Sequence, residues 1–133
     1  MAGIEEILSQ PLPFAEMLGI KIIDASADQV MAEMLVRTDL CTRPAVLHGG
    51  AIMALADTLG AIATVINLPE GASTTTIESK TNFVGPAPLD NTVVAECTPI
   101  HRGKRTMVWQ TRISTREGRL VALVTQTQLV MLA

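Results

Sequence analysis

The sequence predicts an α+β fold in which a curved antiparallel sheet wraps around one long helix. Residues 50–66 are apolar nearly all round a helix, which is typical of a helix that is dry on most sides. A strand pattern precedes this segment, and strands at 91–102, 105–115 and 119–132 follow it with hairpin signals between them. A fourth strand is expected between the helix and these three. The order of strand, long helix and then four strands in a meander favours a sheet packed on a single helix.

The elements before the long helix are short. Residues 3–10 and 13–18 predict two helical segments, the first ended by Pro11 and the second closed by Gly19. Residues 20–37 are strand-like and contain a polar turn.

A loop is expected between this strand region and the helix, at residues 38–46. After the helix, the Thr-rich run at 73–76 starts another strand. That strand stops at GPAP, residues 85–88, because proline cannot extend a ladder of backbone hydrogen bonds.

The 133 residues are expected to form a single domain, 1–133, with 1–19 as an N-terminal helical segment. A net charge of −3 and an aromatic content of 2% argue against nucleic acid as a partner. The N-terminus lacks the basic start and apolar core of a signal peptide. We therefore expect a cytoplasmic protein in which Cys41 and Cys97 stay reduced.

Several common kinds of site have no support in the sequence. Two cysteines and two histidines, with no pair at ligand spacing, are too few for a structural zinc site, so no metal is expected. There is no GxSxG, Walker or GxGxxG motif. No membrane span is expected either, since Asp57 at the centre of the apolar helix would cost about 2.5–3.5 kcal/mol in a bilayer.

Asp57 lies within the apolar stretch LHGGAIMALADTLGAIATVI, residues 47–66. A carboxylate there is either a structural residue, with hydrogen bonds or an arginine at a subunit interface, or a functional one. The LHGG before the helix favours function, because two glycines leave backbone N–H groups uncovered at the positive end of the helix dipole. Such donors can hold an oxyanion.

Gly49 and Asp57 are eight residues apart, which is about 12 Å along a helix and a rotation of some 80°. One helix cannot bring the Gly49 N–H and the Asp57 carboxylate to the same carbonyl. If both act on one substrate they come from different helices, which predicts a symmetric dimer with two interface sites.

Five segments resemble the hotdog-fold acyl-CoA thioesterases, most closely the phenylacetate-pathway (PaaI-like) branch. HGG followed by Asp on the helix, with a later NF-x-x-PA, is a fairly specific combination. The segments, in the family's order, are FAEMLGI (14–20), LHGGAIMALADTLGA (47–61), TNFVGPAP (81–88), HRGK (101–104) and GRLVALVTQT (118–127).

The resemblance implies a hotdog fold, a homodimer with interface active sites and often a dimer of dimers. It implies hydrolysis of an acyl-CoA thioester with no cofactor, coenzyme A being part of the substrate. Gly49 would polarise the thioester carbonyl, and Asp57 would activate water or attack the carbonyl itself. Thr76 would orient the water or the carboxylate, and His48 would shape the oxyanion turn.

The resemblance also implies residues that contact the substrate. The turn HRGKR, 101–105, is either a solvated hairpin or a contact for the CoA nucleotide. Residues 82–86 follow the strand that borders the pantetheine tunnel in relatives. Thr42 stands six residues before His48, where many relatives carry Asn or Gln. The expected substrate- and CoA-binding residues are Thr42, Asn82, Phe83, Gly85, Pro86, Arg102, Gly103, Lys104 and Arg105.

The acyl pocket is expected along the long helix at Ala54, Leu59 and Ala61, and the few aromatic residues favour aliphatic or small aryl acids. Two other functions stay open. A non-catalytic hotdog module that binds acyl-CoA or an acyl carrier is favoured by Thr42. A hotdog dehydratase would pair His48 with Asp57 across the interface. The HGG–Asp spacing favours the thioesterase.

Overall fold

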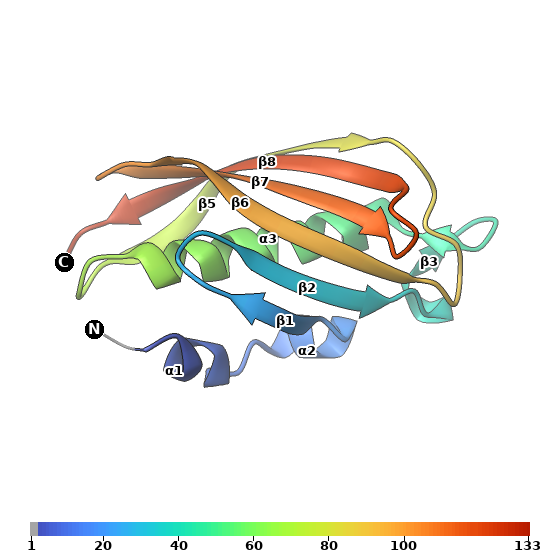
Figure 1. Cartoon of the computed structure of the whole chain (residues 1–133), viewed down its shortest axis with the longest axis horizontal. Coiled ribbons are helices and arrows are strands. Elements are labelled where there is room, and N and C mark those ends of the chain that lie inside the picture. The colour runs from blue at the N-terminus through green and yellow to red at the C-terminus, as the bar shows by residue number, and fades with distance from the viewer. Residues whose placement is uncertain (1–2) are drawn as a thin grey trace.

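The computed structural model describes residues 3–133 and is built around α3 (Gly49–Asn67), which lies along the inner face of a curved antiparallel sheet (Figure 1). The six strands run in the order β1-β2-β6-β7-β8-β5. The predicted α+β fold, a curved antiparallel sheet on one long helix, is confirmed. Of the four strands expected in a meander after the helix, the last three form one, whereas the strand at 73–83 pairs with the last strand at the sheet edge. The strands are β1 (Lys21–Ala25), β2 (Val30–Leu35), β5 (Ser73–Phe83), β6 (Thr92–Arg102), β7 (Thr106–Thr115) and β8 (Leu120–Met131).

β5 forms one edge of the sheet. It pairs with β8 from Ser73 to Phe83, with a bulge between Thr76 and Glu78. On its other side it pairs with no strand in the described part of the chain. Ile77 and Phe83 on this strand are 55% and 56% exposed. A long edge with apolar side chains is a surface on which another strand can pair.

Two short helices, α1 (Ile4–Ser9) and α2 (Pro13–Leu18), pack against α3 on the side away from the sheet (Figure 1). α2 begins on a proline, which is favourable because the first helical position needs no N–H. It ends at Gly19, whose φ of +78° is the left-handed conformation that glycine adopts without strain. The described part of the expected segment 1–19, residues 3–19, thus contains two short helices.

The segment before α3 is more ordered than the expected loop at 38–46. It contains a 3₁₀ helix, η1 (Thr38–Leu40), and a small hairpin of β3 (Cys41–Thr42) and β4 (Val46–Leu47). Strands of two residues are too short to show alternation in the sequence. The hairpin leads directly into α3, and the His48 N–H donates to the Leu40 carbonyl at 2.9 Å.

The core lies between α3 and the sheet. Trp109 on β7 is fully buried there, and its Nε1–H donates to Thr64 Oγ1 on α3 at 2.9 Å. The Thr64 hydroxyl in turn donates to the Gly60 carbonyl at 2.7 Å. Leu55 and Leu59 of α3 are also fully buried. Leu59, which was expected to line an acyl pocket, belongs to this core.

α3 is buried on most of its faces, as its sequence predicted. One face leaves Gly50, Met53, Asp57 and Val65 exposed, and we call these four residues the exposed stripe. By length and a mean hydropathy of 1.7, α3 is the one helix among the described residues that could cross a membrane. Its other faces pack in the core, so α3 is the central helix of the fold.

Candidate active site

The N-terminus of α3 presents one free backbone donor. His48 is the residue before the helix, and its Nδ1 accepts a hydrogen bond from the Gly50 N–H at 2.7 Å. The Ala51 N–H donates to the His48 carbonyl at 3.0 Å. Gly49, the first helical residue, has no acceptor within the helix, and no side chain among residues 3–133 accepts from its N–H. The N–H groups of Gly50 and Ala51 are therefore paired within the turn, and the Gly49 N–H remains available to a ligand.

The ring of Phe83 at the end of β5 covers Gly49. A Cβ built on Gly49 would lie 3.1 Å from Cε1 of that ring. The next segment of chain runs beside β4, where the Leu47 N–H donates to the Ala87 carbonyl at 2.8 Å. The structure thus brings Phe83 to the start of α3, and Gly85 and Pro86 lie on the segment between Phe83 and Ala87.

Asp57 lies two turns further along α3, on the exposed stripe, and accepts two hydrogen bonds at one oxygen. Its Oδ1 accepts from the Thr76 hydroxyl at 2.7 Å and from Gln126 Nε2 at 3.2 Å. No side chain or backbone group in the described residues donates to the other carboxylate oxygen, Oδ2. One carboxylate oxygen is therefore held by protein, and the other remains available.

The hydrogen bonds continue behind Thr76 into the core. Gln128 Nε2 donates to Thr76 Oγ1 at 2.7 Å, and the Thr74 hydroxyl donates to Gln128 Oε1 at 2.9 Å. Because Thr76 accepts from Gln128, its own hydrogen points to Asp57. Gln128 and Gln126 are 0% and 1% exposed, so both amides are held by packing.

Gly60 makes the room that Gln126 occupies. A Cβ on Gly60 would lie 2.3–2.5 Å from the three terminal atoms of the Gln126 side chain. Glycine within a helix costs roughly 1 kcal/mol relative to alanine. Here its missing side chain lets the Gln126 amide pass close to the helix and reach Asp57.

Sequence reasoning missed Gln126 and Gln128. A signal was present, because β8 alternates, and Val124, Gln126, Gln128 and Val130 all face inward. Two amides among inward positions of an apolar strand require buried polar partners. What the sequence did not supply was the register that sets Gln128 opposite Thr76 on β5.

The remaining predicted binding residues lie in different places. Thr42 is exposed on β3, where it pairs with Val46 two residues before His48. Asn82 is exposed near the end of β5, next to Phe83. Both lie toward the end of the molecule at which α3 begins.

The basic turn, which we define as residues 101–105, lies at the opposite end of α3. Arg102 donates to the Ala27 carbonyl at 2.9 Å and to Asp28 Oδ1 at 2.8 Å, so it ties β6 to the β1–β2 turn. It also reaches Asn67 Oδ1, the last residue of α3, at 3.5 Å. Gly49 and Asn67 are about 27 Å apart along the helix axis. Within one chain the structure does not bring the basic turn to Gly49.

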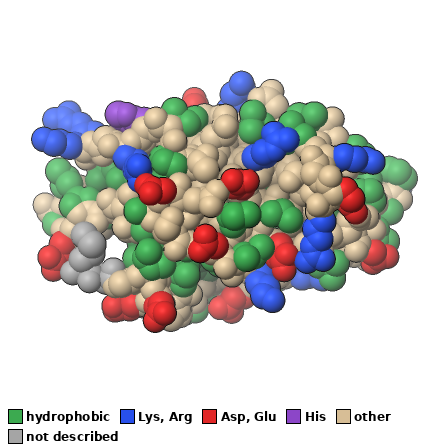
Figure 2. Space-filling model, viewed as in Figure 1, with side chains coloured by type: hydrophobic (Ala, Val, Ile, Leu, Met, Phe, Trp, Pro, Cys, Tyr) green, Lys and Arg blue, Asp and Glu red, His purple; other side chains and the backbone are tan. Residues whose placement is uncertain are grey.

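Positive charge gathers at that end of the molecule. In Figure 2, Lys and Arg side chains cluster at the tip that Figure 1 shows to be the turn between β6 and β7. A cavity of about 410 Å³ beside the turn is lined by Arg102, Gly103 and Lys104 together with Asn67 and Met107.

The cysteines and histidines do not form a further site. Burial raises the pKa of the Cys97 thiol to about 11, so it stays protonated at neutral pH. Cys41 is half-buried, and its thiol donates to the Arg37 carbonyl at 3.2 Å. Across residues 3–133, no three His, Cys, Asp or Glu side chains gather as metal ligands.

Comparison with known proteins places this geometry in a family. The model of the thioesterase superfamily matches residues 45–122, from the β3–β4 hairpin into β8. The proofreading thioesterase EntH of Klebsiella pneumoniae is 32% identical over 102 residues, covering 77% of this chain and 74% of that protein.

Solved structures show the same fold over nearly the whole chain. A thioesterase from Haemophilus influenzae has a TM-score of 0.86 at 30% identity, covering 98% of this chain and 92% of that one. The Escherichia coli PaaI protein of the phenylacetic acid degradation operon has a TM-score of 0.84 at 25% identity, covering 92% and 86%. The chain belongs to the thioesterase superfamily, and it is a hotdog-fold thioester hydrolase.

Proposed function

We propose that this protein hydrolyses acyl-CoA thioesters to a free acid and CoA at sites shared between two copies of the chain. The Gly49 N–H of one copy binds the thioester oxygen, and Asp57 of the second copy acts on the other side of the carbonyl. One observation carries the proposal. A free donor and a carboxylate with one free oxygen lie on the same helix, yet about 12 Å apart along its axis.

The exposed stripe supports the shared site. Met53 is 37% exposed and lies midway between Gly49 and Asp57. Two antiparallel α3 helices that cross at Met53 bring Gly49 of each copy to Asp57 of the other. The same two-fold axis lets the free edges of β5 meet, which covers the apolar side chains there. We propose this homodimer as the active unit, and a dimer of dimers as the full assembly.

The reaction follows from these groups. Water adds to the carbonyl carbon as Asp57 takes its proton, and the Gly49 N–H stabilises the charge that forms on oxygen. The C–S bond then breaks, the acid forms, and CoA leaves as a thiolate that takes up a proton. In a second route Asp57 attacks the carbonyl itself, and water hydrolyses the anhydride. Neither route uses a cofactor.

Coenzyme A has a continuous path in such a dimer. Thr42 and residues 82–86 border the thioester and its arm at the Gly49 end. A crossing at Met53 sets Asn67 of the second copy about 15 Å beyond Gly49 along the axis. The basic turn, which Arg102 ties to Asn67, then lies where the CoA phosphates arrive, with Lys104 and Arg105 as their contacts.

The first test measures thiol release from short, medium and aryl acyl-CoAs by the wild type and by Asp57→Asn. We expect Asp57→Asn to lose about 100-fold or more in kcat, the range for removing a general base. Asp24→Asn, on exposed β1, is the matched control and keeps its rate. If acyl-CoA binds but no thioester is cleaved by the wild type, the protein is a binding module.

A second test isolates the backbone donor. Gly49→Pro removes the N–H at a helical position that accepts proline, whereas Gly49→Ala places a Cβ at the same point beside Phe83 and keeps the N–H. We expect Gly49→Pro to lose about 10²–10³ in kcat beyond any loss in Gly49→Ala. Equal rates in the two variants would remove Gly49 from the mechanism.

Mixing the two inactive variants tests the shared site. In a heterodimer of Gly49→Pro and Asp57→Asn, one of two sites has both groups intact. A refolded equal mixture therefore recovers about one quarter of wild-type activity, from half the dimers and half their sites. No recovery would mean that each site lies within one chain.

The dehydratase alternative has less support. It needs His48 as an acid or base, but His48 Nδ1 already accepts from Gly50. A 3-hydroxyacyl-CoA belongs in the same panel, because its dehydration without thiol release would favour that alternative.

A further inference from the structure

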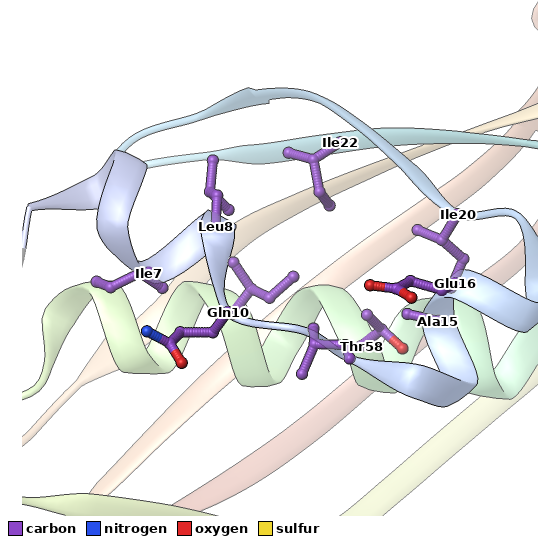
Figure 3. Close-up of a pocket in the computed structure, with 10 residues that line it drawn as sticks. Ile7, Leu8, Gln10, Ala15, Glu16, Ile20, Ile22 and Thr58 are labelled. Atoms are coloured by element: carbon purple, nitrogen blue, oxygen red, sulfur yellow. The ribbon is translucent and has the colours of Figure 1, made fainter.

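α1, α2 and β1 enclose a cavity against α3 (Figure 3). Its volume is about 110 Å³. Figure 3 shows aliphatic side chains from α1 and β1 on one side and Thr58 of α3 on the other. The apolar residues of the wall are Ile7, Leu8, Leu12, Ala15, Ile20, Ile22 and Ile62.

The apolar side chains of α1 and of the link between α1 and α2 lie around this space and are not buried in the core. α1 contributes no buried residue. Leu8 and Leu12 remain 37% and 45% exposed. Burying one such side chain fully is worth about 1.5–3 kcal/mol, so the segment has apolar surface left to offer to a ligand.

The cavity lies next to the candidate active site. A second hollow of about 260 Å³ is lined by Asp57, Thr58 and Ala61 of α3 and by residues 12–15. Leu12, Ala15 and Thr58 line both spaces. Together the two adjacent spaces form a path beside α3 from Asp57, past α2, to Ile62, which is about 7.5 Å along the helix.

We infer that this path holds the acyl group of the substrate, and that the substrate carries an unbranched aliphatic acyl chain of about six to eight carbons. The inference rests on the proposed function. A 150 Å³ apolar cavity admits benzene, so 110 Å³ takes roughly four or five carbon atoms. The carbons next to the carbonyl occupy the hollow beside Asp57, and the rest enter the cavity.

The polar side chains at the cavity sharpen the specificity. Gln10 and Glu16 line it opposite Thr58 (Figure 3). The Glu16 carboxylate repels an acyl chain that ends in a second carboxylate. A bicyclic aryl group has about ten ring carbons, more than a volume of 110 Å³ takes. The acyl group is therefore apolar to its end.

The test compares two neighbouring isoleucines on β1. Ile22 lines the cavity, whereas Ile23 is 52% exposed. The readout is kcat/KM for octanoyl-CoA divided by that for acetyl-CoA. We expect Ile22→Phe to lower this ratio about 10-fold or more, as misfitting methylenes do in a closed pocket. Ile23→Phe keeps the wild-type ratio.

Discrimination against acyl chains that end in a carboxylate is tested with Glu16→Gln. Wild type is expected to discriminate against adipoyl-CoA relative to hexanoyl-CoA, and Glu16→Gln to reduce that discrimination several-fold. A wild type that prefers acetyl-CoA, adipoyl-CoA or a naphthoyl-CoA over octanoyl-CoA overturns the inference, as does an equal ratio in Ile22→Phe and Ile23→Phe.

A binding experiment separates this inference from the proposed function. S-octyl-CoA, a thioether that cannot be hydrolysed, is titrated calorimetrically into wild type, Ile22→Phe and Ile23→Phe. If no thioester is cleaved but Ile22→Phe alone binds this probe about 10-fold more weakly, hydrolysis fails and the acyl site stands. If thioesters are cleaved but the three proteins bind the probe equally, the acyl site is wrong and hydrolysis stands. If wild type neither cleaves thioesters nor binds the probe, both are overturned.

Discussion

Asp57 is positioned by residues that are far from it in the sequence. Thr76 and Gln126 donate to the same carboxylate oxygen, Oδ1, at 2.7 and 3.2 Å. Two donors on one oxygen fix the orientation of the group and leave Oδ2 for water. The buried Gln128 behind Thr76 and the bare Cα of Gly60 behind Gln126 keep both donors in place. Catalytic groups need such support, because small displacements reduce rates strongly.

Gly60→Ala tests this support. Alanine normally stabilises a helix by about 1 kcal/mol over glycine, but here its Cβ would displace the Gln126 amide. We expect Gly60→Ala to lower both the melting temperature and kcat, measured by calorimetry and thiol release.

The partner variant for Gly60→Ala is Gln126→Ala, which frees the space. In the double variant the added methyl group no longer clashes, so its effect on stability becomes small or favourable. Additive losses in the double variant would show that Gly60 and Gln126 do not act together.

Cys97 makes stability depend on pH at the alkaline end. Its thiol has a pKa of about 11 in the folded chain, against an ordinary 9.0. The folded chain therefore holds the proton more tightly than the unfolded chain. Stability is unaffected below about pH 9 and falls between pH 9 and 11 by up to ~1.4 kcal/mol per unit. Urea unfolding across this range checks the slope, which Cys97→Ala is expected to lose.

At the residue scale the sequence predicted what local motifs can encode. His48 and Gly49 are placed by the turn that begins α3, and Asp57 by its spacing from them. Gln126 depends on β8 lying over α3, and Gln128 on its register with β5. Such long-range pairing leaves no local pattern, which is why both amides were missed.

At the scale of elements, α3 and β5 form adjoining surfaces that the described chain leaves uncovered. Both leave apolar side chains exposed on adjoining parts of the fold, the exposed stripe on the helix and Ile77 on the strand edge. An isolated chain with a long free edge is prone to pairing with another chain. In the proposed dimer, the helix that carries Asp57 and the strand that carries Thr76 would therefore both contact the second copy.

Met53→Lys is expected to convert the dimer to monomers and to abolish thiol release, because two buried ammonium groups would face each other at the two-fold axis. Leu35→Lys, on β2 and 49% exposed, is the matched control. Light scattering after size exclusion gives the mass, and circular dichroism checks the fold. A monomeric Met53→Lys with full activity would contradict the shared site.

The long elements were predictable and the short ones were not. α3 and the last three strands are long enough for their periodicity to define them, and Gly and Pro mark their ends. The hairpin of β3 and β4 has two residues per strand. The exposed stripe of α3 had no signal in the sequence, because Gly, Met and Val on an open face are as apolar as residues that pack in the core.

At the scale of the whole molecule, the basic turn and the proposed oxyanion donor are separated by the length of α3. The free Gly49 N–H lies at one end and the basic turn at the other. In a head-to-tail pair of helices each reacting centre then takes its phosphate contacts from the other copy. The distance between Gly49 and the basic turn in one chain is then what allows an extended substrate to contact both copies.

Lys104→Ala combined with Arg105→Ala is expected to raise KM for acyl-CoA severalfold, since each exposed charge contact contributes roughly 0.2–1 kcal/mol. kcat stays near its wild-type value. The corresponding acyl-pantetheine, which lacks the nucleotide phosphates, shows no change in KM. Lys21→Ala, on β1, is the control for net charge. Equal effects on both substrates would rule out a phosphate contact.

The single tryptophan offers an optical reading of all these states. The chain has one Trp and no Tyr, so its near-ultraviolet emission comes almost entirely from Trp109. That indole is enclosed between β7 and α3 and hydrogen-bonded to Thr64. Its emission shifts to longer wavelength only when α3 separates from the sheet and exposes the indole to water. Dilution that lowers specific activity while the emission stays blue therefore reports separated but folded subunits, without any label.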